Sequence, residues 1–104
     1  LEHSRIFIFG NNGNPEVYIS SADFMTRNID ARVEVTCPIY DERIKQELLE
    51  SFEVGWKGNV KARLHSEKLD NKYRVRDENE RIFRAQLETY NYYRNQLEVI
   101  TEKL

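Results

Sequence analysis

The fold is decided first by residues 5–20, RIFIFGNNGNPEVYIS. Residues 5–9 are β-branched and aromatic, residues 10–15 are dense in turn formers, and residues 16–20 are again strand-like, with Val17 and Ile19 on one face. Two strand-like runs joined by a turn-rich loop are typical of a β-hairpin. The sequence therefore predicts an antiparallel hairpin at the start of the chain.

Working outward, the next segments predict a helical turn, a strand and a helix. Residues 22–27 fit a short helical turn capped by Ser21, with Asn28 as its left-handed exit. Alternation over residues 32–37 predicts a half-buried strand that ends at Pro38, with Cys37 as a small buried side chain. From Asp41 to about residue 57, apolar residues at helical spacing predict an amphipathic helix: Ile44, Leu48, Leu49, Phe52 and Trp56.

The second half of the chain repeats the same kinds of element. Residues 60–65 and 72–76 each alternate between apolar and polar side chains, which predicts a second hairpin. Asp77 and Glu80 resemble a capping box, and a long apolar stripe from Phe83 to Leu104 predicts a C-terminal helix. We expect residues 1–104 to form a single α+β domain, in which a mixed or antiparallel sheet of hairpins packs with the amphipathic helix and the long C-terminal helix.

Composition narrows the possible functions. The chain has 104 residues, of which 33% are charged, and a net charge of -2, so it is too short for a complete large enzyme and carries no general attraction for nucleic acid. It has no apolar run long enough to cross a membrane, no zinc-type ligand set, and a single Cys37, which fits a reducing cytoplasm. Because it opens on Leu1, we expect it to be a piece of something larger.

Positive charge gathers in one segment. Residues 58–76 hold six basic and two acidic residues, an excess of four positive charges. If the two strands of the second hairpin pair, their basic residues line one sheet face. A solvated face is the simpler interpretation, and a track for a polyanion is the alternative.

The densest polar cluster, residues 20–34, lies between two predicted strands. Arg27 and Arg32 could clamp phosphate oxygens, with Ser21 and Asn28 as neutral donors. Equally, Ser21 is only a cap and Asn28 only a turn residue. His3, just before the first strand, has the side chain for a phosphate ligand, nucleophile or general acid, or is an unconstrained terminal histidine.

Several stretches, in order along the chain, resemble the C-terminal domain of bacterial polyphosphate kinase of the first type. They are LEHSRIF (1–7), YISSADFMTRNID (18–30), RVEV (32–35), NVKAR (59–63) and RAQ (84–86). The resemblance implies a phospholipase-D-like half domain that is the last, catalytic-half portion of a multidomain enzyme. In the phospholipase D motif, however, Arg5 here replaces a lysine, Gly10 an aspartate and Asp23 an asparagine.

The resemblance also implies roles for residues of this chain. His3 matches the second active-site histidine, which contacts the nucleotide phosphates or protonates the leaving group. Ser21, Arg27 and Asn28 would support it as phosphate- or nucleotide-binding residues. The neighbouring polar residues could touch substrate or only hold the loop: Arg5, Asp30, Arg32 and Glu34.

The implied reaction is reversible transfer of the terminal phosphate of ATP to inorganic polyphosphate, through a phosphohistidine on a preceding domain. ATP and ADP would be the substrates, magnesium would be bound by residues outside this segment, and the segment alone is expected to be inactive. The implied partners are the preceding domains and further copies in a homo-oligomer, with no nucleic acid and no transmembrane segment. The implied location is the cytoplasm, with the periphery of the inner membrane as an alternative.

Two other functions compete with this one. The first is a phospholipase-D-like phosphodiesterase half-site, in which His3 itself attacks phosphorus; the lost lysine and aspartate argue against it. The second is a non-catalytic module that binds a polyanion or another subunit through residues 58–76 and the long helix. Polymer synthesis from ATP, diester hydrolysis, or neither would distinguish the three.

Overall fold

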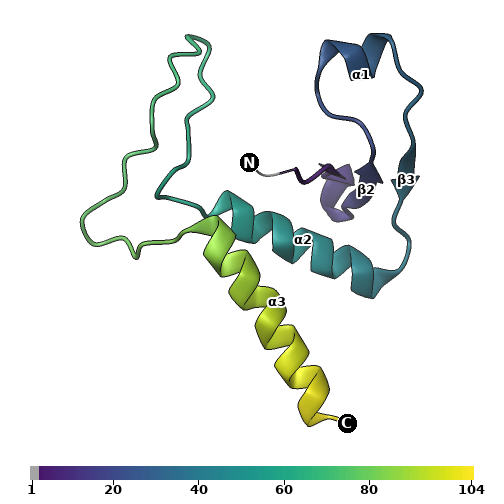
Figure 1. The fold of residues 1–104 in the computed structure, drawn as a ribbon, viewed down its shortest axis with the longest axis vertical. Coiled ribbons are helices and arrows are strands. Elements are labelled where there is room, and N and C mark those ends of the chain that lie inside the picture. Colours follow the sequence, from purple (N-terminus) through teal and green to yellow (C-terminus); the bar gives the residue numbers. More distant parts are fainter. Residues whose placement is uncertain (1–2) are drawn as a thin grey trace. The chain divides into compact units, whose positions relative to one another are not determined.

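A computed structural model describes residues 3–104 and shows an α+β chain with two compact units, Leu1–Phe52 and Glu53–Leu104 (Figure 1). The boundary falls within helix α2 (Glu42–Trp56). Within residues 3–104, no helix combines the length and the apolar character needed to cross a membrane.

The first unit is built on a three-stranded antiparallel sheet in the order β1-β2-β3, formed by β1 (Ile6–Phe9), β2 (Glu16–Ser20) and β3 (Thr36–Pro38). The predicted hairpin is confirmed: Ile8 lies opposite Val17, and a turn of 3₁₀ helix, η1 (Asn11–Gly13), fills the loop. Asn11, Asn12 and Gly13 all have positive φ, a conformation that asparagine and glycine adopt more readily than other residues.

The centre of this sheet is its best-buried point. Val17, on the middle strand, is 2% exposed, and the backbone N–H of Ile39 donates to its carbonyl at 2.9 Å. On the opposite face, the rings of Phe9 and Tyr18 meet edge-on with centroids 5.8 Å apart. Strand alternation therefore sends aliphatic side chains to one face and aromatic side chains to the other.

The segment between β2 and β3 differs from the prediction. The helix there is α1 (Thr26–Asp30), which begins later than predicted and has Met25 rather than Ser21 at its N-terminus, without a side-chain cap. Asn28 lies inside the helix rather than at its exit, because its side chain is buried by polar contacts to Glu34. Ser21 also binds Glu34, so it is not free to cap.

The third strand is shorter than predicted, and its side chains are less buried. It begins at Thr36, and Val33 and Val35, predicted to face inward, are 100% and 70% exposed. Cys37 is exposed, so the prediction of a buried thiol is wrong. β3 lies at the edge of the sheet and pairs with β2 on one side. The alternation of apolar and polar residues does not reveal whether another part of the protein covers the face of this strand.

Helix α2 is confirmed at both ends. It begins after Asp41, whose carboxylate accepts hydrogen bonds from the backbone N–H groups of Arg43 at 2.9 Å and Ile44 at 3.2 Å. These bonds satisfy helix donors that otherwise lack partners, and they lower the pKa of Asp41. The helix ends at Trp56, close to the predicted stop at Gly58.

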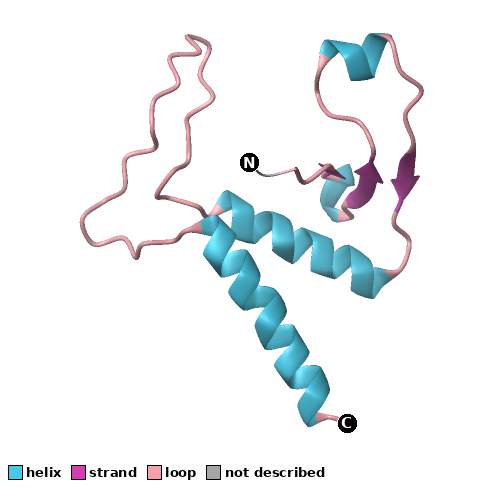
Figure 2. Cartoon of the chain, in the orientation of Figure 1, coloured by secondary structure: helices cyan, strands magenta, loops and turns pink. Residues whose placement is uncertain are grey.

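In the second unit, a long loop connects the end of α2 to α3 (Ala85–Glu102) and doubles back on itself (Figure 2). The predicted second hairpin is reduced to a single antiparallel bridge between Arg63 and Tyr73, flanked by two backbone hydrogen bonds. The strands stop there because no third strand continues the ladder among the described residues.

Asn59 closes the base of this loop. Its side chain is 4% exposed; its amide donates to the carbonyl of Arg81 and its carbonyl accepts from the N–H of Phe83, both at 2.8 Å. Glu80 does not begin the helix, as the predicted capping box requires, because its carboxylate binds Arg74 at 2.7 Å. The helix therefore starts at Ala85, where Asn59 has already fixed the preceding backbone.

We expect Val17→Ala to lower the free energy of unfolding by roughly 2 kcal/mol, because it removes two methyl groups from the best-buried position of the sheet. Val33→Ala makes the same chemical change at a fully exposed position, and its effect should stay within about 0.5 kcal/mol. Urea titration of both variants measures the difference. Equal effects would contradict the placement of the core.

Candidate functional site

An ion pair ties the segment after β2 to the start of β1. Nε of Arg5 lies 2.7 Å from one carboxylate oxygen of Asp23, and Nη2 lies 3.2 Å from the other. The backbone reinforces this pair, since the N–H of Ser20 donates to the carbonyl of Arg5 at 3.0 Å. The hydrogen bonds from Arg5 lower the pKa of Asp23, although partial burial opposes them.

A second carboxylate organises the rest of the loop. Glu34 accepts hydrogen bonds from the hydroxyl of Ser21 and from the amide of Asn28, the latter at 2.7 Å. The N–H of Val35 donates in turn to the Ser21 hydroxyl at 3.0 Å. Ser21 and then Asn28 are the main reasons that the pKa of Glu34 lies below its usual value. The loop from 21 to 35 is therefore closed by polar contacts rather than by an apolar core.

Asn28 has one polar atom left over. The residue is 5% exposed, and its Oδ1 has no hydrogen-bond partner among the described residues. Phosphate oxygens at neutral pH accept hydrogen bonds, and Oδ1 can only accept. Its free atom is thus of the wrong kind for a phosphate, and Asn28 would contact one only through its NH2 group, which already serves Glu34.

His3 and Arg27 are both exposed, and both lie within electrostatic reach of Asp23. Each acts through its positive charge to lower the pKa of that carboxylate, in addition to the larger effect of Arg5. Neither side chain makes a hydrogen bond within the described range 3–104. They are therefore available to a ligand, whereas Ser21 and Asn28 are engaged.

The two carboxylates belong to one electrostatic neighbourhood. Arg5 binds Asp23 and also lowers the pKa of Glu34 through its charge, and Arg32 acts on Glu34 in the same way. Arg5 and Glu34 thus hold the loop, one of the two roles the sequence left open for them.

The hydrogen-bond donors that remain exposed at this site, on His3 and Arg27, are of a kind that suits an anion. The described residues contain no group of three or more His, Cys, Asp or Glu side chains placed to hold one. Asp23 and Glu34 are occupied by donors from their own chain.

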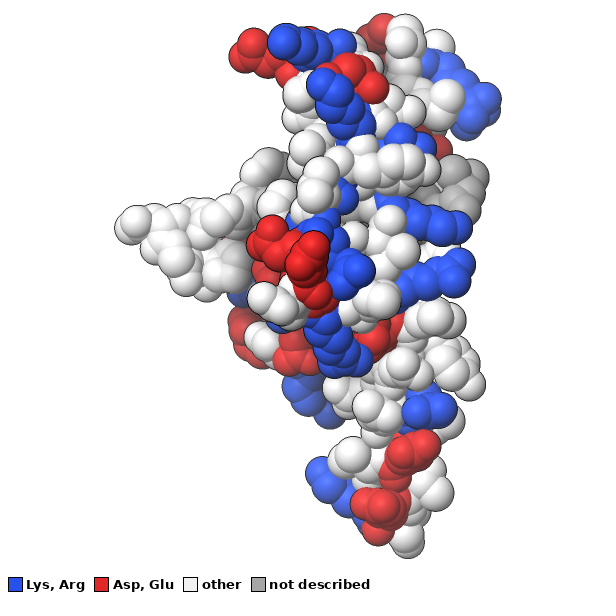
Figure 3. Space-filling model, turned by 90° about the vertical axis from the view of Figure 1, so that its left-hand side faces the viewer, with Lys and Arg blue, Asp and Glu red and all other residues white. Residues whose placement is uncertain are grey.

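Part of the positive charge of residues 58–76 is engaged by contacts within the same chain. Arg74 pairs with Glu80, Lys72 pairs with Asp70 at 2.9 Å, and the guanidinium of Arg63 lies 3.3 Å from the centre of the Tyr73 ring. On the face drawn in Figure 3, Lys and Arg side chains are interspersed with Asp, Glu and uncharged side chains. These contacts favour the solvated interpretation over an open polyanion track.

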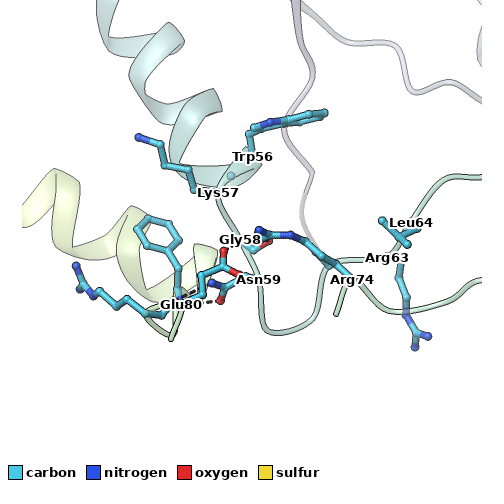
Figure 4. Close-up of a pocket in the computed structure, with 12 residues that line it drawn as sticks. Trp56, Lys57, Gly58, Asn59, Arg63, Leu64, Arg74 and Glu80 are labelled. Atoms are coloured by element: carbon cyan, nitrogen blue, oxygen red, sulfur yellow. Dashed lines mark hydrogen bonds and ion pairs between the residues drawn. The ribbon is translucent and has the colours of Figure 1, made fainter. Parts of the chain in front are cut away.

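A pocket of about 820 Å³ lies against the base of the same loop (Figure 4). Arg74 extends across it to Glu80 and to the carbonyl of Gly58, at 3.4 Å, and Arg81 at its rim pairs with Glu88 at 3.1 Å. Its arginines are thus held by acids and carbonyls of the loop. The pocket lies on the inner side of the loop closure, where Arg74 and Arg81 have acidic partners and Lys57 adds a further positive charge to the lining.

Two of these arrangements were not predicted from the sequence. Asp23 was identified only as a departure from the phospholipase D motif, and its pairing with Arg5 was missed. The sequence held part of the signal, because Asp23 adds a negative charge where the motif has asparagine, while Arg5 keeps the positive charge of the motif's lysine. The acceptor role of Glu34 had no comparable signal, since it depends on how a loop folds.

Comparison with known proteins gives the family. Residues 1–86 match the family described as polyphosphate kinase C-terminal domain 2. Over 95 residues, 91% of the chain, it is 48% identical to a polyphosphate kinase of Klebsiella pneumoniae and 47% identical to one of Escherichia coli K12. A crystal structure of polyphosphate kinase from Porphyromonas gingivalis matches 95% of the chain with a TM-score of 0.86 and 39% identity.

The chain belongs to the polyphosphate kinase C-terminal domain family. It spans 14% of the length of these two curated relatives and 15% of the solved chain. The resemblance noted in the sequence is thereby confirmed, and it concerns the C-terminal part of a much longer protein.

We expect the contribution of Glu34 to stability to depend on pH. Its pKa in the folded chain lies below the ordinary value of about 4.3, so the contribution is complete above that value and is lost as the pH falls through the folded pKa. Glu34→Gln should therefore be less stable than the wild type at pH 7, and the difference should shrink below about pH 4.5.

Thermal melting of both proteins between pH 3 and 7 measures this difference. Glu47→Gln, the same change at an exposed position on α2, serves as the control and should track the wild type. A gap between Glu34→Gln and the wild type that stays constant across the pH range would show that Glu34 acts without its charge.

Proposed function

We propose that this chain supplies the C-terminal part of the active site of a polyphosphate kinase. The parent reaction is reversible transfer of the terminal phosphoryl group of ATP to inorganic polyphosphate. The proposed reaction rests on one observation, which is that the chain belongs to this family. The exposed His3 and Arg27, gathered around the Arg5–Asp23 pair, support the location of the site.

In this proposal the phosphoryl group moves in two steps. A histidine on a preceding domain attacks the γ-phosphorus of ATP; the bond to the bridging oxygen breaks, and ADP leaves. The terminal oxygen of a polyphosphate chain then attacks the phosphohistidine and frees the imidazole. Such transfers depend on positioning and on neutralising charge at the phosphoryl oxygens.

His3 and Arg27 are the residues of this chain that would act on the phosphates. His3 would either donate a proton to the leaving oxygen or bind a phosphoryl oxygen, and Arg27 would bind phosphate through a charge-assisted hydrogen bond. Ser21 and Asn28 remain in the proposal as neutral phosphate donors. They would have to exchange their contact with Glu34 for the phosphate, so we assign them the smaller part.

The fold, the further domains, the substrates and the assembly that the sequence led us to expect are also part of this proposal. We propose a phospholipase-D-like half domain, joined to preceding domains of the same chain that carry the phosphohistidine and the magnesium site. ATP, ADP and polyphosphate would be its substrates, and the parent would be a cytoplasmic homo-oligomer. The three-stranded antiparallel sheet of an α+β chain is compatible with that half domain.

The phosphodiesterase alternative is disfavoured by the Arg5–Asp23 contact. These residues stand where the phospholipase D motif has lysine and asparagine, and here they bind each other at 2.7 Å. A phosphodiester would have to compete with Asp23 for the guanidinium of Arg5, and the Asp23 carboxylate would repel it. The polyanion-binding alternative is disfavoured by the internal contacts of Arg63, Lys72 and Arg74.

We expect His3→Ala in the full-length parent enzyme to lower kcat by about 10²- to 10⁴-fold, the usual contribution of a general acid or base. The fold should survive, because the side chain is exposed and lies ahead of β1. Steady-state kinetics measures the effect, with circular dichroism as the folding control. Near-normal turnover would remove His3 from the active site.

We expect Arg27→Ala to weaken phosphate binding more than it slows chemistry, because a charge-assisted contact is lost in both the ground state and the transition state. The KM for ATP or polyphosphate should rise roughly tenfold while kcat changes little. Arg43→Ala, an exposed arginine of α2, is the matched control. Equal kinetics for the two variants would exclude Arg27 as a ligand.

A further inference from the structure

Helix α3 carries an apolar stripe that the proposed function does not use. Tyr90, Tyr93, Leu97 and Ile100 follow one another at intervals of three, four and three residues. On a helix with 3.6 residues per turn, these four side chains fall within an arc of about 80°. We call this set the α3 seam. Its spacing is typical of a helix face that packs against another surface along the helix axis.

The α3 seam is exposed although its side chains are large and apolar. Its least exposed member, Tyr93, is 41% exposed, and α3, which the structure describes over its whole length, contains no buried residue. The ring of Tyr93 meets that of Tyr92 on the same helix, and Arg94 reaches over the ring of Tyr90. Helices in proteins owe most of their stability to packing of an apolar face. The composition of the seam therefore calls for more cover than residues 3–104 give it.

The first turn of α3 is attached to the rest of the second unit. The Asn59 side chain binds the backbone of Arg81 and Phe83, both at 2.8 Å, just ahead of the helix. Arg81 then pairs with Glu88 at 3.1 Å. The seam begins directly after these contacts, so the place from which it is presented is fixed by its own unit.

The charges of α3 indicate what kind of surface could cover the seam. Its acidic residues lie on the side of the helix away from the seam: Glu88, Glu98 and Glu102. The edges of the seam are formed by Thr89 and Gln96 on one side and by Arg94 and Thr101 on the other. An apolar strip with neutral or basic edges suits a partner surface that is apolar at its centre and neutral or acidic at its rim.

We propose that the α3 seam is the docking face of this chain for the preceding part of the same protein. The inference rests on the proposed function only because it takes preceding domains to exist. The chain spans 14% of the length of the curated relatives it matches, so most of the surface against which the seam could pack lies outside residues 1–104. A seam that is bare in this part of the protein is covered once the preceding domains are in place.

A second copy of this chain is the less suitable partner. The seam runs over residues 90–100, about one and a half heptads, whereas helices that pair through such a seam generally continue for about three to four heptads. Two of its four positions are tyrosine, where paired helices prefer Ile, Val or Leu. A partner in the same chain needs less contact, because the linkage holds it at a high effective concentration.

The first experiment identifies what touches the seam in the full-length parent protein. Photoreactive benzoylphenylalanine replaces Tyr93, so that an aromatic side chain is kept at the centre of the seam. On irradiation we expect a cross-linked product with the mass of one chain, in which residue 93 is joined to a peptide of the preceding domains. The same probe at Asn95, on the polar side of α3, should give at least tenfold less of this product.

The second experiment places a charge in the seam. Leu97→Lys keeps a residue that favours helices but puts an ammonium group where apolar contact is proposed. In the full-length protein, amide hydrogen exchange over residues 90–100 should become roughly tenfold faster, while exchange in the sheet of the first unit stays at the wild-type rate. Asn95→Lys adds the same charge on the polar side and should exchange like the wild type.

The outcomes separate this inference from the proposed function. Cross-links from residue 93 to a second chain or to residues 1–84, or no cross-link at all, would overturn the docking proposal. Unchanged exchange in Leu97→Lys would overturn it too, and if that variant does not fold, the cross-linking result decides alone. Neither experiment measures phosphoryl transfer. A parent protein that makes no polyphosphate from ATP would therefore overturn the proposed function and leave an observed docking contact standing.

Discussion

The contact between Arg5 and Asp23 is the constraint on which the first unit depends. A two-point ion pair brings the end of β2 and the loop after it against the start of β1, where no apolar core is large enough to do so. Once Asp23 is fixed, the chain can enter α1 with Arg27 on the same side. The position of this loop is set by ion pairs and hydrogen bonds rather than by apolar packing.

Glu34 likewise holds the far end of the loop through polar contacts. By accepting from Ser21 and Asn28 it uses the donors that would otherwise be the obvious phosphate ligands. The remaining ones, His3 and Arg27, are left exposed beside carboxylates that are already satisfied. In the proposed function these two side chains would meet the phosphates, while the carboxylates around them keep their own partners.

The sequence predicted well wherever one local signal was sufficient. The hairpin around Val17 and the helix after Asp41 follow from alternation, turn residues and a cap, and both are confirmed. Prediction failed where a polar side chain had several possible partners: Ser21, Asn28 and Glu80 were expected at helix ends, and all three bind side chains instead. Cys37 was expected to be buried because alternation cannot reveal whether a sheet face is covered. The candidate site was located from the family resemblance, and its internal ion pair required three-dimensional geometry.

The closure made by Asn59 has a consequence for how this family can vary. Because one buried amide joins residue 59 to residues 81 and 83, the start of α3 is set at the neck of the loop rather than along its length. The chain beyond the neck is held by a single bridge and by pairs near the surface. Lengthening a loop whose ends are already joined costs little conformational entropy. The segment beyond the neck can therefore change in length without displacing the helix that follows.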